Sequence, residues 1–433
     1  FVPNVSSQCY KVNNFNYNSA QIVDCDWSNP IKQDVNNKLN QETGAAPEEM
    51  FKVKLDCRSD NITLCNNINL AFNRASKTIS TVLKLNTQIV VNATLRNFCE
   101  GFTPETCDPN LKKLLGQAGP NMLYALEDDD GLERLYPQAL VKQFQFPRNP
   151  TFNEFDIFAE FNTNFPLWFE EDGPIEESET DFFYVMIHEL MHGLGFLSFW
   201  TQIPDKLALI PTFVPKFSGT NGDAQINDTT LIKDVTVKES ALDKSMIFLS
   251  NGSSVSSITK HISDFMIKNP GEADPFEKFG QSEIKMLTDM YILATTPKSL
   301  GLLPRGSTNF VSDAIILETA INPYVQGSSI THFDFATYLN TSDFLMMFQA
   351  VNGKPIKELI KDGGNYPGGV IGPKLKLMLE TIGYTTEDNP NPYKPKPFKE
   401  EKAISSAINR RFSFDFTSNI YILIFTLLYL LIN

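Results

Sequence analysis

Residues 188–192 combine two histidines and a glutamate at a spacing that suits metal chemistry. His188 and His192 are four positions apart, so on a helix both imidazoles lie on one face and can reach one metal ion. Glu189 would face a water on that metal and act as its general base. The plainer alternative is a core helix that happens to carry two histidines, although the chain has only 4 histidines in 433 residues. We predict a catalytic Zn²⁺ site with His188 and His192 as ligands and Glu189 as the base.

The helix that carries these residues is apolar on nearly every side, which is typical of a buried helix. Its polar edge must therefore face a cleft, because buried charged groups need partners. We expect Ser178 to open the helix, with Asp181 three residues later completing a capping box. Gly193 and Gly195 would let the chain turn away after the second histidine. The predicted core face consists of Phe183, Ile187, Leu190 and Leu194.

Regular elements are also predicted upstream of this helix. Apolar residues spaced four and three apart predict a helix from Asn66 to about Leu85. Residues 88–95 are rich in β-branched side chains and predict a strand, and residues 155–161 alternate as another. We expect an extended peptide to add along an edge strand within residues 156–169.

A catalytic zinc site needs a third protein ligand besides the two helical histidines. The remaining histidines are His261 and His332. The sequence around His261 has no feature beyond ordinary helix or loop chemistry, and His332 can equally be a loop histidine. A carboxylate such as Glu239 is a rival third ligand. The residues alone leave this choice open.

A family resemblance bears on the third ligand. The run H-E-x-x-H-x-x-G resembles the start of the metzincin signature, but the position of its third histidine is Ser198 here. Leishmanolysin-type peptidases are more similar, since they insert a long segment after the glycine and take the ligand from a Ser-His-aromatic segment. The segment Ser329-Ile-Thr-His332-Phe333, with Leu345-Met346 downstream, is similar in order and spacing. His-Gly-Leu-Gly-Phe at 192–196 also resembles secreted microbial and fungal zincins.

The resemblance implies an α+β, zincin-like catalytic domain, with a twisted mixed sheet and an active-site helix, followed by a mostly helical or irregular C-terminal subdomain. It implies His332 as third ligand and Met346 as the hydrophobic base beneath the metal, although a Met beside Leu and Phe is often simply core. Tyr338 is a candidate oxyanion stabiliser. The implied activity is a zinc metalloendopeptidase, in which Glu189 activates a zinc-bound water. The alternative is a non-proteolytic adhesion or structural protein that keeps a structural zinc helix.

We expect five regions along the chain. They are a disulfide-bearing N-terminal region (1–60), an upper catalytic subdomain (61–200), a lower subdomain with the insertion, third ligand and Met turn (201–386), a Pro/Lys/Glu stalk (387–404) and a glycosylphosphatidylinositol (GPI) attachment signal (405–433).

The composition limits the classes of partner. A hydrophobic content of 42% and a charged content of 20% are those of a globular protein. The net charge of −14 argues against nucleic acid and against basic patches for anionic membranes. We expect protein or peptide substrates and a monomer.

Six cysteines in the first quarter of the chain indicate an oxidising compartment. We predict local pairs Cys57–Cys65 and Cys99–Cys107, and a metal cluster is disfavoured because no C-x-x-C pair occurs. Six N-x-S/T sequons agree with an extracellular glycoprotein. The chain begins at Phe1 rather than Met, so we expect that a signal peptide has been removed or lies outside this fragment. The cysteines are Cys9, Cys25, Cys57, Cys65, Cys99 and Cys107, and the sequon asparagines are Asn4, Asn61, Asn92, Asn227, Asn251 and Asn340.

The C-terminal residues suggest a membrane attachment. Residues 420–432 are almost entirely apolar but span only about 20 Å as a helix, less than the ~30 Å hydrocarbon core. Small residues at 405–407, a spacer and this tail match a GPI signal with attachment at Ser405. We therefore predict a cell-surface protein held by a lipid anchor, with a short C-terminal membrane helix as the alternative.

Overall fold

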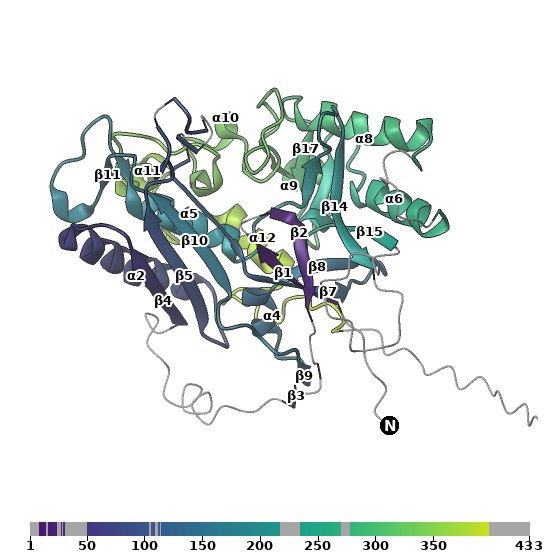
Figure 1. Cartoon of the computed structure of the whole chain (residues 1–433), viewed down its shortest axis with the longest axis horizontal. Helices are drawn as coiled ribbons and strands as arrows, with labels where there is room; N and C mark the ends of the chain where they lie inside the picture. The colour runs from purple at the N-terminus through teal and green to yellow at the C-terminus, as the bar shows by residue number, and fades with distance from the viewer. Residues whose placement is uncertain are drawn as a thin grey trace, which may run out of the picture. The chain divides into compact units, whose positions relative to one another are not determined.

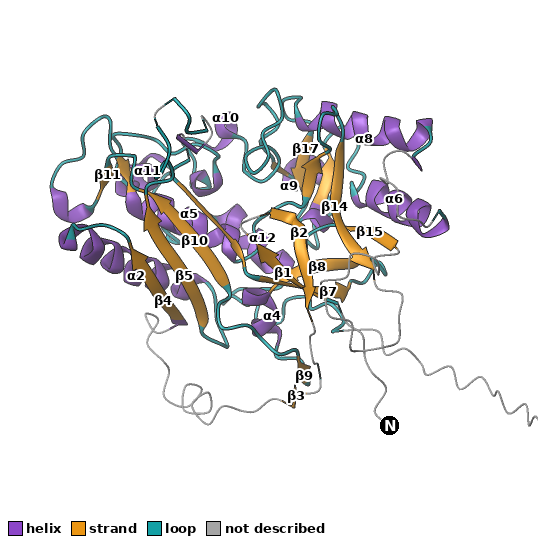
Figure 2. Cartoon of the chain, viewed as in Figure 1, coloured by secondary structure: helices purple, strands orange, loops and turns teal. Residues whose placement is uncertain are grey.

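The computed structural model describes residues 8–13, 16–23, 27, 29–30, 50–103, 105–108, 111–112, 114–216, 234–269 and 278–397. All of them belong to one compact unit, Ser7–Phe398, and a second unit, Phe1–Ser6 with Lys399–Asn433, lies outside the described residues. The described part is a mixed α+β structure, as predicted (Figures 1 and 2).

One four-stranded sheet supports the helix that carries His188 and His192. Its three parallel strands are followed at one edge by an antiparallel strand. On the internal strand β5, successive residues alternate between buried and half-buried, and all the buried ones are apolar. This is the pattern of a sheet with one face more deeply covered than the other. Helices α2 (Ile62–Val82) and α5 (Phe182–Gly193) contact this sheet and each other (Figure 1). In spatial order the strands are β4 (Phe51–Cys57), β5 (Ile89–Arg96), β10 (Ile157–Asn162) and β6 (Gly116–Pro120).

A second four-stranded sheet is antiparallel throughout. Helix α4 (Gln138–Phe144) follows its last strand. Two strands of two residues each, β3 (Asn29–Pro30) after β2 and β9 (Arg148–Asn149) after α4, pair with each other. In spatial order the sheet contains β2 (Asn16–Val23), β1 (Cys9–Asn13), β7 (Met122–Glu127) and β8 (Glu133–Pro137).

The segment after α5 forms a small sheet covered by two helices. Strands β13 (Trp200–Gln202), β14 (Leu209–Lys216) and β15 (Asp234–Lys238) form an antiparallel sheet. Helices α6 (Ser256–Lys268) and α8 (Gln281–Ala294) pack against it, and the shared apolar residues form a separate hydrophobic cluster. The insertion therefore has its own small core.

Short elements complete the lower part of the chain. A further three-stranded sheet contains β16 (Met246–Phe248), β17 (Leu300–Leu302) and β18 (Ile315–Ile316). The remaining short elements are β11 (Leu167–Trp168), β12 (Thr180–Asp181), η2 (Glu170–Asp172), η4 (Asp243–Ser245), η5 (Phe344–Met346), α9 (Phe310–Asp313), α10 (Phe335–Tyr338), α11 (Ile356–Asp362) and α12 (Pro373–Ile382).

Several predicted elements are present with shifted ends. The helix expected from Asn66 is α2, but its N-cap is Asn61, whose side chain accepts a hydrogen bond from the Leu64 N–H at 3.1 Å. The expected strands 88–95 and 155–161 are β5 and β10. Residues 201–386, expected to be mostly helical or irregular, also contain two three-stranded sheets. Several of those strands have only two or three residues, too few for an alternating pattern to be recognised.

Both predicted local disulfides are present, Cys57–Cys65 and Cys99–Cys107. The first joins the end of β4 to the first turn of α2. Cys9 is also disulfide-bonded, and Cys25 lies outside the described residues.

Residues 387–397, expected to begin a stalk, lie against the core. The Lys394 Nζ donates to the Phe144 carbonyl at 2.9 Å, and Lys396 forms both a backbone bridge and an ion pair with Glu127. The rest of the predicted stalk and the whole predicted GPI signal lie outside the described residues. Among helices of the described ranges, none combines the length and apolar character needed to cross a bilayer.

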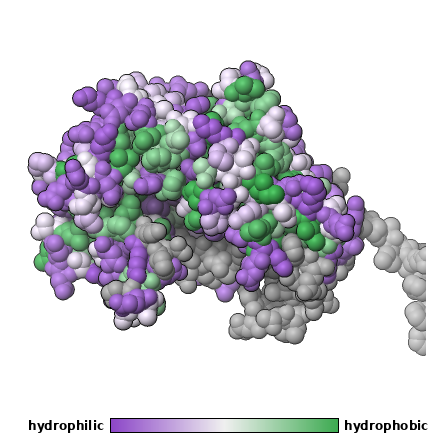
Figure 3. All heavy atoms as spheres, turned by 90° about the horizontal axis from the view of Figure 1, so that it is seen from above, coloured by the Kyte–Doolittle hydropathy of each residue, from purple (hydrophilic) through white to green (hydrophobic). Residues whose placement is uncertain are grey.

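The surface of the described part mixes polar and apolar side chains. Figure 3 shows hydrophilic residues interspersed with small hydrophobic areas on the face seen from above. Large exposed apolar residues come from distant parts of the chain, for example Ile62, Phe102 and Val311. Isolated exposed apolar residues of this kind are normal for a globular protein.

Candidate metal centre

Helix α5 is fixed at its N-terminus by Asp181. One carboxylate oxygen accepts hydrogen bonds from the N–H groups of Phe183 and Tyr184, and the other accepts from Ile356 of α11 at 2.8 Å. The capping residue is therefore Asp181, and the prediction that Ser178 opens the helix is wrong. A side-chain oxygen at this position satisfies backbone donors that have no partner inside the helix.

Two glycines let the end of α5 approach its neighbours closely. A Cβ on Gly193 would lie 2.5–2.9 Å from side-chain atoms of Ile157 on β10, so only glycine permits this helix–sheet distance. Gly195 has a φ of +114°, a conformation that favours glycine, and it turns the chain away from the helix as expected.

The structure brings three of the four histidines together. His188 and His192 of α5 meet His332, which is more than 130 residues further along the chain. The Nε2 atoms form a nearly equilateral triangle with sides of 3.1 Å (His188–His332), 3.2 Å (His188–His192) and 3.2 Å (His192–His332). His188 and His332 are 7% and 5% exposed, so the cluster is largely shielded from water.

Backbone carbonyls determine which ring nitrogen carries the hydrogen. The Nδ1 of His188 lies 2.7 Å from the Leu345 oxygen, that of His192 lies 2.6 Å from the Phe196 oxygen, and that of His332 lies 3.0 Å from the Ser328 oxygen. A carbonyl oxygen only accepts, so each Nδ1 is the donor and each neutral ring keeps an unprotonated Nε2. The three Nε2 lone pairs therefore converge with no hydrogen between them.

This arrangement suits a cation. Burial lowers the pKa of His188 to about 3 and that of His192 to about 4, and burial together with the two neighbouring histidines lowers the pKa of His332 well below its usual value. The rings are thus neutral, which is the form that binds a metal. Three nitrogens each about 2.0–2.1 Å from one tetrahedral zinc ion are about 3.3 Å apart, close to the observed sides. The residues present therefore fit Zn²⁺.

The turn containing Met346 lies directly against helix α5. Met346 is fully buried in η5, and the carbonyl of its neighbour Leu345 accepts hydrogen bonds from His188 and from the hydroxyl of Tyr184. The Met346 carbonyl accepts from the Phe333 N–H at 2.7 Å. This turn therefore orients His188 and binds the segment that carries His332.

Glu189 follows His188 on α5, and its side chain lies against the edge strand β6. Burial raises the pKa of its carboxyl to about 8, and a hydrogen bond with the backbone of Ala118 opposes this rise. A Cβ on Gly116 would lie 3.2 Å from the Glu189 Cγ, so β6 passes directly beside this side chain. The prediction that residues 156–169 contain the edge strand is wrong. The strand formed there is β10, and it lies inside the sheet because it pairs with β5 on one side and β6 on the other.

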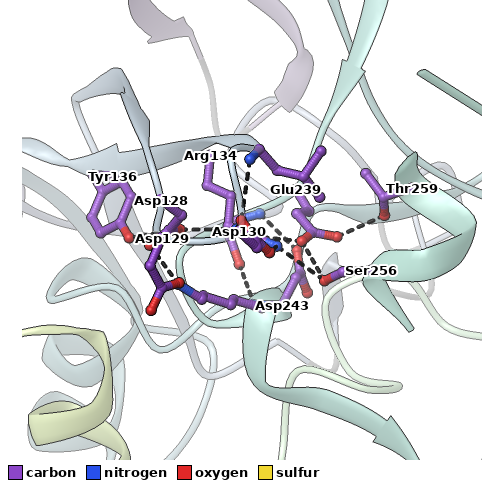
Figure 4. Close-up of polar contacts among 12 residues, drawn as sticks. Asp128, Asp129, Asp130, Arg134, Tyr136, Glu239, Asp243, Ser256 and Thr259 are labelled. Atoms are coloured by element: carbon purple, nitrogen blue, oxygen red, sulfur yellow. Dashed lines mark hydrogen bonds and ion pairs between the residues drawn. The ribbon is translucent and has the colours of Figure 1, made fainter. Parts of the chain in front are cut away.

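Two other candidate site residues, Tyr338 and Glu239, have their contacts outside the cluster of three histidines. The Tyr338 hydroxyl accepts from the Ile316 N–H at 3.0 Å and its ring packs on Phe333, so its observed contacts do not involve the histidines. Glu239 binds Arg134, Ser256 and Thr259 in a separate buried network, described below (Figure 4).

The fourth histidine, His261 of α6, is also separate from the cluster. Its Nε2 lies 2.8 Å from a carboxylate oxygen of Glu283 on α8. Of the sequons within the described ranges, Asn61, Asn251 and Asn340 are exposed, and Asn92 is half-buried on β5. Asn4, Asn227 and Ser405 lie outside those ranges.

Sequence comparison assigns the chain to a family. Residues 9–400 match the model of the SPBPB7E8-like family, so the chain belongs to this family. The uncharacterized protein PB7E8.01 of Schizosaccharomyces pombe is 25% identical over 352 residues, which cover 76% of this chain. The match spans 60% of the yeast protein's length. No solved structure matches the chain significantly. Neither description states an activity.

Proposed function

We propose that this protein is a zinc-dependent endopeptidase with a zincin-like catalytic domain. The observation that carries the proposal is the convergence of three buried Nε2 lone pairs, two of them from a helix that also carries the buried Glu189. Purely structural zinc sites are closed by four protein ligands, whereas catalytic sites use three and leave a position open. The three histidines, two of them on the helix that also carries Glu189, match the second type.

The roles of the residues follow from their chemistry. His188, His192 and His332 would hold Zn²⁺, which when bound lowers the pKa of water and polarises a carbonyl. Glu189 would accept the proton of the attacking water and then donate it to the leaving amine. The Leu345, Phe196 and Ser328 carbonyls keep the three rings in the required tautomer.

The substrate would bind in extended form along β6. Among the residues that the structure describes, this strand pairs only with β10, so its other edge can pair with a peptide main chain. Gly116 and Ala118 of β6 lie beside Glu189, so a peptide paired there passes the base and the histidines. Main-chain pairing favours unfolded or extended segments of proteins as substrates.

We also propose an extracellular location. The disulfides Cys57–Cys65 and Cys99–Cys107 support it, because such bonds persist in oxidising compartments. Exposed sequons at Asn61, Asn251 and Asn340 are accessible for glycans. Attachment to the cell surface through a GPI anchor at Ser405, and a monomeric state, complete the proposal.

The test compares wild type with Glu189→Gln on a broad library of unstructured peptides, using the full chain loaded with one zinc. We expect cleavage by wild type to fall about 10²- to 10⁴-fold in the variant, with zinc content unchanged, because general-base catalysis is lost. Glu283→Gln makes the same chemical change at the carboxylate next to His261 and should leave cleavage unchanged. If wild type and Glu189→Gln are equally inert with zinc bound, the peptidase proposal fails and an adhesion or structural role remains.

A further inference from the structure

His332 lies on a segment held between two other segments. Phe333, its neighbour, forms an antiparallel bridge with Leu317 and a parallel bridge with Met347. The segment after β18 therefore flanks the third ligand on one side, and the Met turn flanks it on the other. The position of the His332 ring depends on these two neighbours, because residues 330–334 are not part of a helix or a long strand.

Glu318 makes four hydrogen bonds in this arrangement. Its N–H donates to the His332 carbonyl at 2.8 Å, and its carbonyl accepts from the Ile330 N–H at 2.8 Å. One carboxylate oxygen accepts from the Phe335 N–H at 3.1 Å, and the other accepts from the Ala320 N–H at 2.8 Å. The side chain is 2% exposed. Three of the four bonds thus hold residues on both sides of the third ligand.

The backbone that Glu318 holds is unusual. Ile330 has a φ of +56°, a left-handed conformation that is a genuine outlier for a β-branched residue. It is fully buried, and its N–H is the one that donates to Glu318. Such conformations persist where surrounding contacts determine them and are concentrated at functional sites. The contacts of Glu318 are among those that can hold this conformation two residues before the ligand.

The geometry points to Glu318 as the positioning residue of His332: its buried carboxylate and backbone fix the third-ligand segment so that the His332 Nε2 meets those of His188 and His192. This inference rests on the proposed metal site. Both carboxylate oxygens accept from backbone N–H groups, and glutamine cannot replace them, since its NH₂ group would face a donor.

The test measures zinc affinity of the full chain by competition with a chromophoric chelator. We expect Glu318→Gln to weaken zinc binding about 10- to 100-fold, as residues that orient metal ligands do. The Co²⁺-loaded variant should have an altered visible absorption spectrum. Glu318→Asp keeps both acceptor oxygens on a shorter side chain, so its affinity should lie between those of wild type and Glu318→Gln; this milder variant also serves if the glutamine variant does not fold.

Asp156→Asn is the matched control. Asp156 is also a fully buried carboxylate that accepts a backbone N–H, that of Val90, but its contacts are with β5 and α4. It should lower the temperature of unfolding and leave zinc affinity unchanged. If Glu318→Gln binds zinc as tightly as wild type, or if both variants weaken binding equally, the inference is overturned and the metal site stands. If wild type binds no zinc, the proposed function itself fails.

Discussion

Two buried polar clusters in this molecule are built in opposite ways. The first is the set of three histidines, whose Nε2 atoms all point lone pairs at one place with no donor among them. The second surrounds Arg134, which is fully buried and donates to Glu239 at 2.6 Å, Asp128 at 3.0 Å and Asp130 at 2.7 Å (Figure 4).

The network around Arg134 satisfies itself. Tyr136 donates to Asp128 at 3.0 Å, Thr259 donates to Glu239 at 2.6 Å, and Lys244 lies 2.7 Å from Asp128. Buried carboxylates, cations and hydroxyls are thereby matched, and the network joins the β7–β8 hairpin to the insertion. The three Nε2 atoms of the histidine cluster, in contrast, are all acceptors that face one another. From this difference we infer that the saturated network serves the fold, and we propose that the histidine cluster, which lacks a donor, binds a cation.

The largest expected effect on zinc binding is that of losing the third ligand. His332→Ala should weaken zinc binding about 100- to 1,000-fold, because zinc binding free energies of about 10–16 kcal/mol are shared among four ligands. Chelator competition measures the change. His261→Ala is the control and should bind zinc as wild type does, since His261 contacts Glu283 instead. The reverse pattern would mean that the triangle of histidines is not the metal site.

Removing the cation of the saturated network should affect stability alone. Arg134→Met removes the buried cation that Asp128 and Glu239 share, so we expect a loss of about 3–5 kcal/mol in the free energy of unfolding. Urea unfolding measures this loss. Arg305→Met is the control at the exposed edge and should cost less than about 1 kcal/mol. A fall in zinc affinity of folded Arg134→Met would contradict the separation of the two clusters.

The smallest effect concerns acid. Burial raises the pKa of Asp129, but hydrogen bonds and charges of Lys244 and Arg305 outweigh it and lower the pKa from 3.8 to about 2. The folded-state pKa is thus the lower one, so the contribution is fully present above about pH 4 and is lost as the pH falls towards 2. Asp129 is nearly half exposed, so the contribution is below about 1 kcal/mol. Unfolding measured from pH 5 to 2.5 should be less pH-dependent in Asp129→Asn; equal slopes would contradict this role.

The local features of the site could be predicted from the sequence. His188, Glu189 and His192 lie within about one turn of one helix, and cysteines eight positions apart in Cys57–Cys65 lie within reach of each other. These features depend on helix geometry and short chain segments only. His332 required the family resemblance and the small number of histidines.

The remaining features depend on contacts distant in sequence. The carbonyls that orient the histidines belong to the backbone, so the identity of Leu345 or Ser328 gives no signal. The edge strand could not be identified from the sequence. In the sheet, β6 pairs with β10 and forms the edge, and the alternation of residues along a strand does not encode the order of strands. Glu239 was a reasonable ligand candidate because its partner Arg134 is 105 positions away.

The central claim is that the three convergent imidazoles bind one zinc ion. X-ray absorption at the zinc K-edge, on the full chain loaded with one equivalent of zinc, tests it most directly. The account predicts three imidazole nitrogens and one oxygen at about 2.0–2.1 Å, with one imidazole fewer in His332→Ala. A shell with sulfur or without three imidazoles, or a chain that takes up no zinc, would contradict it.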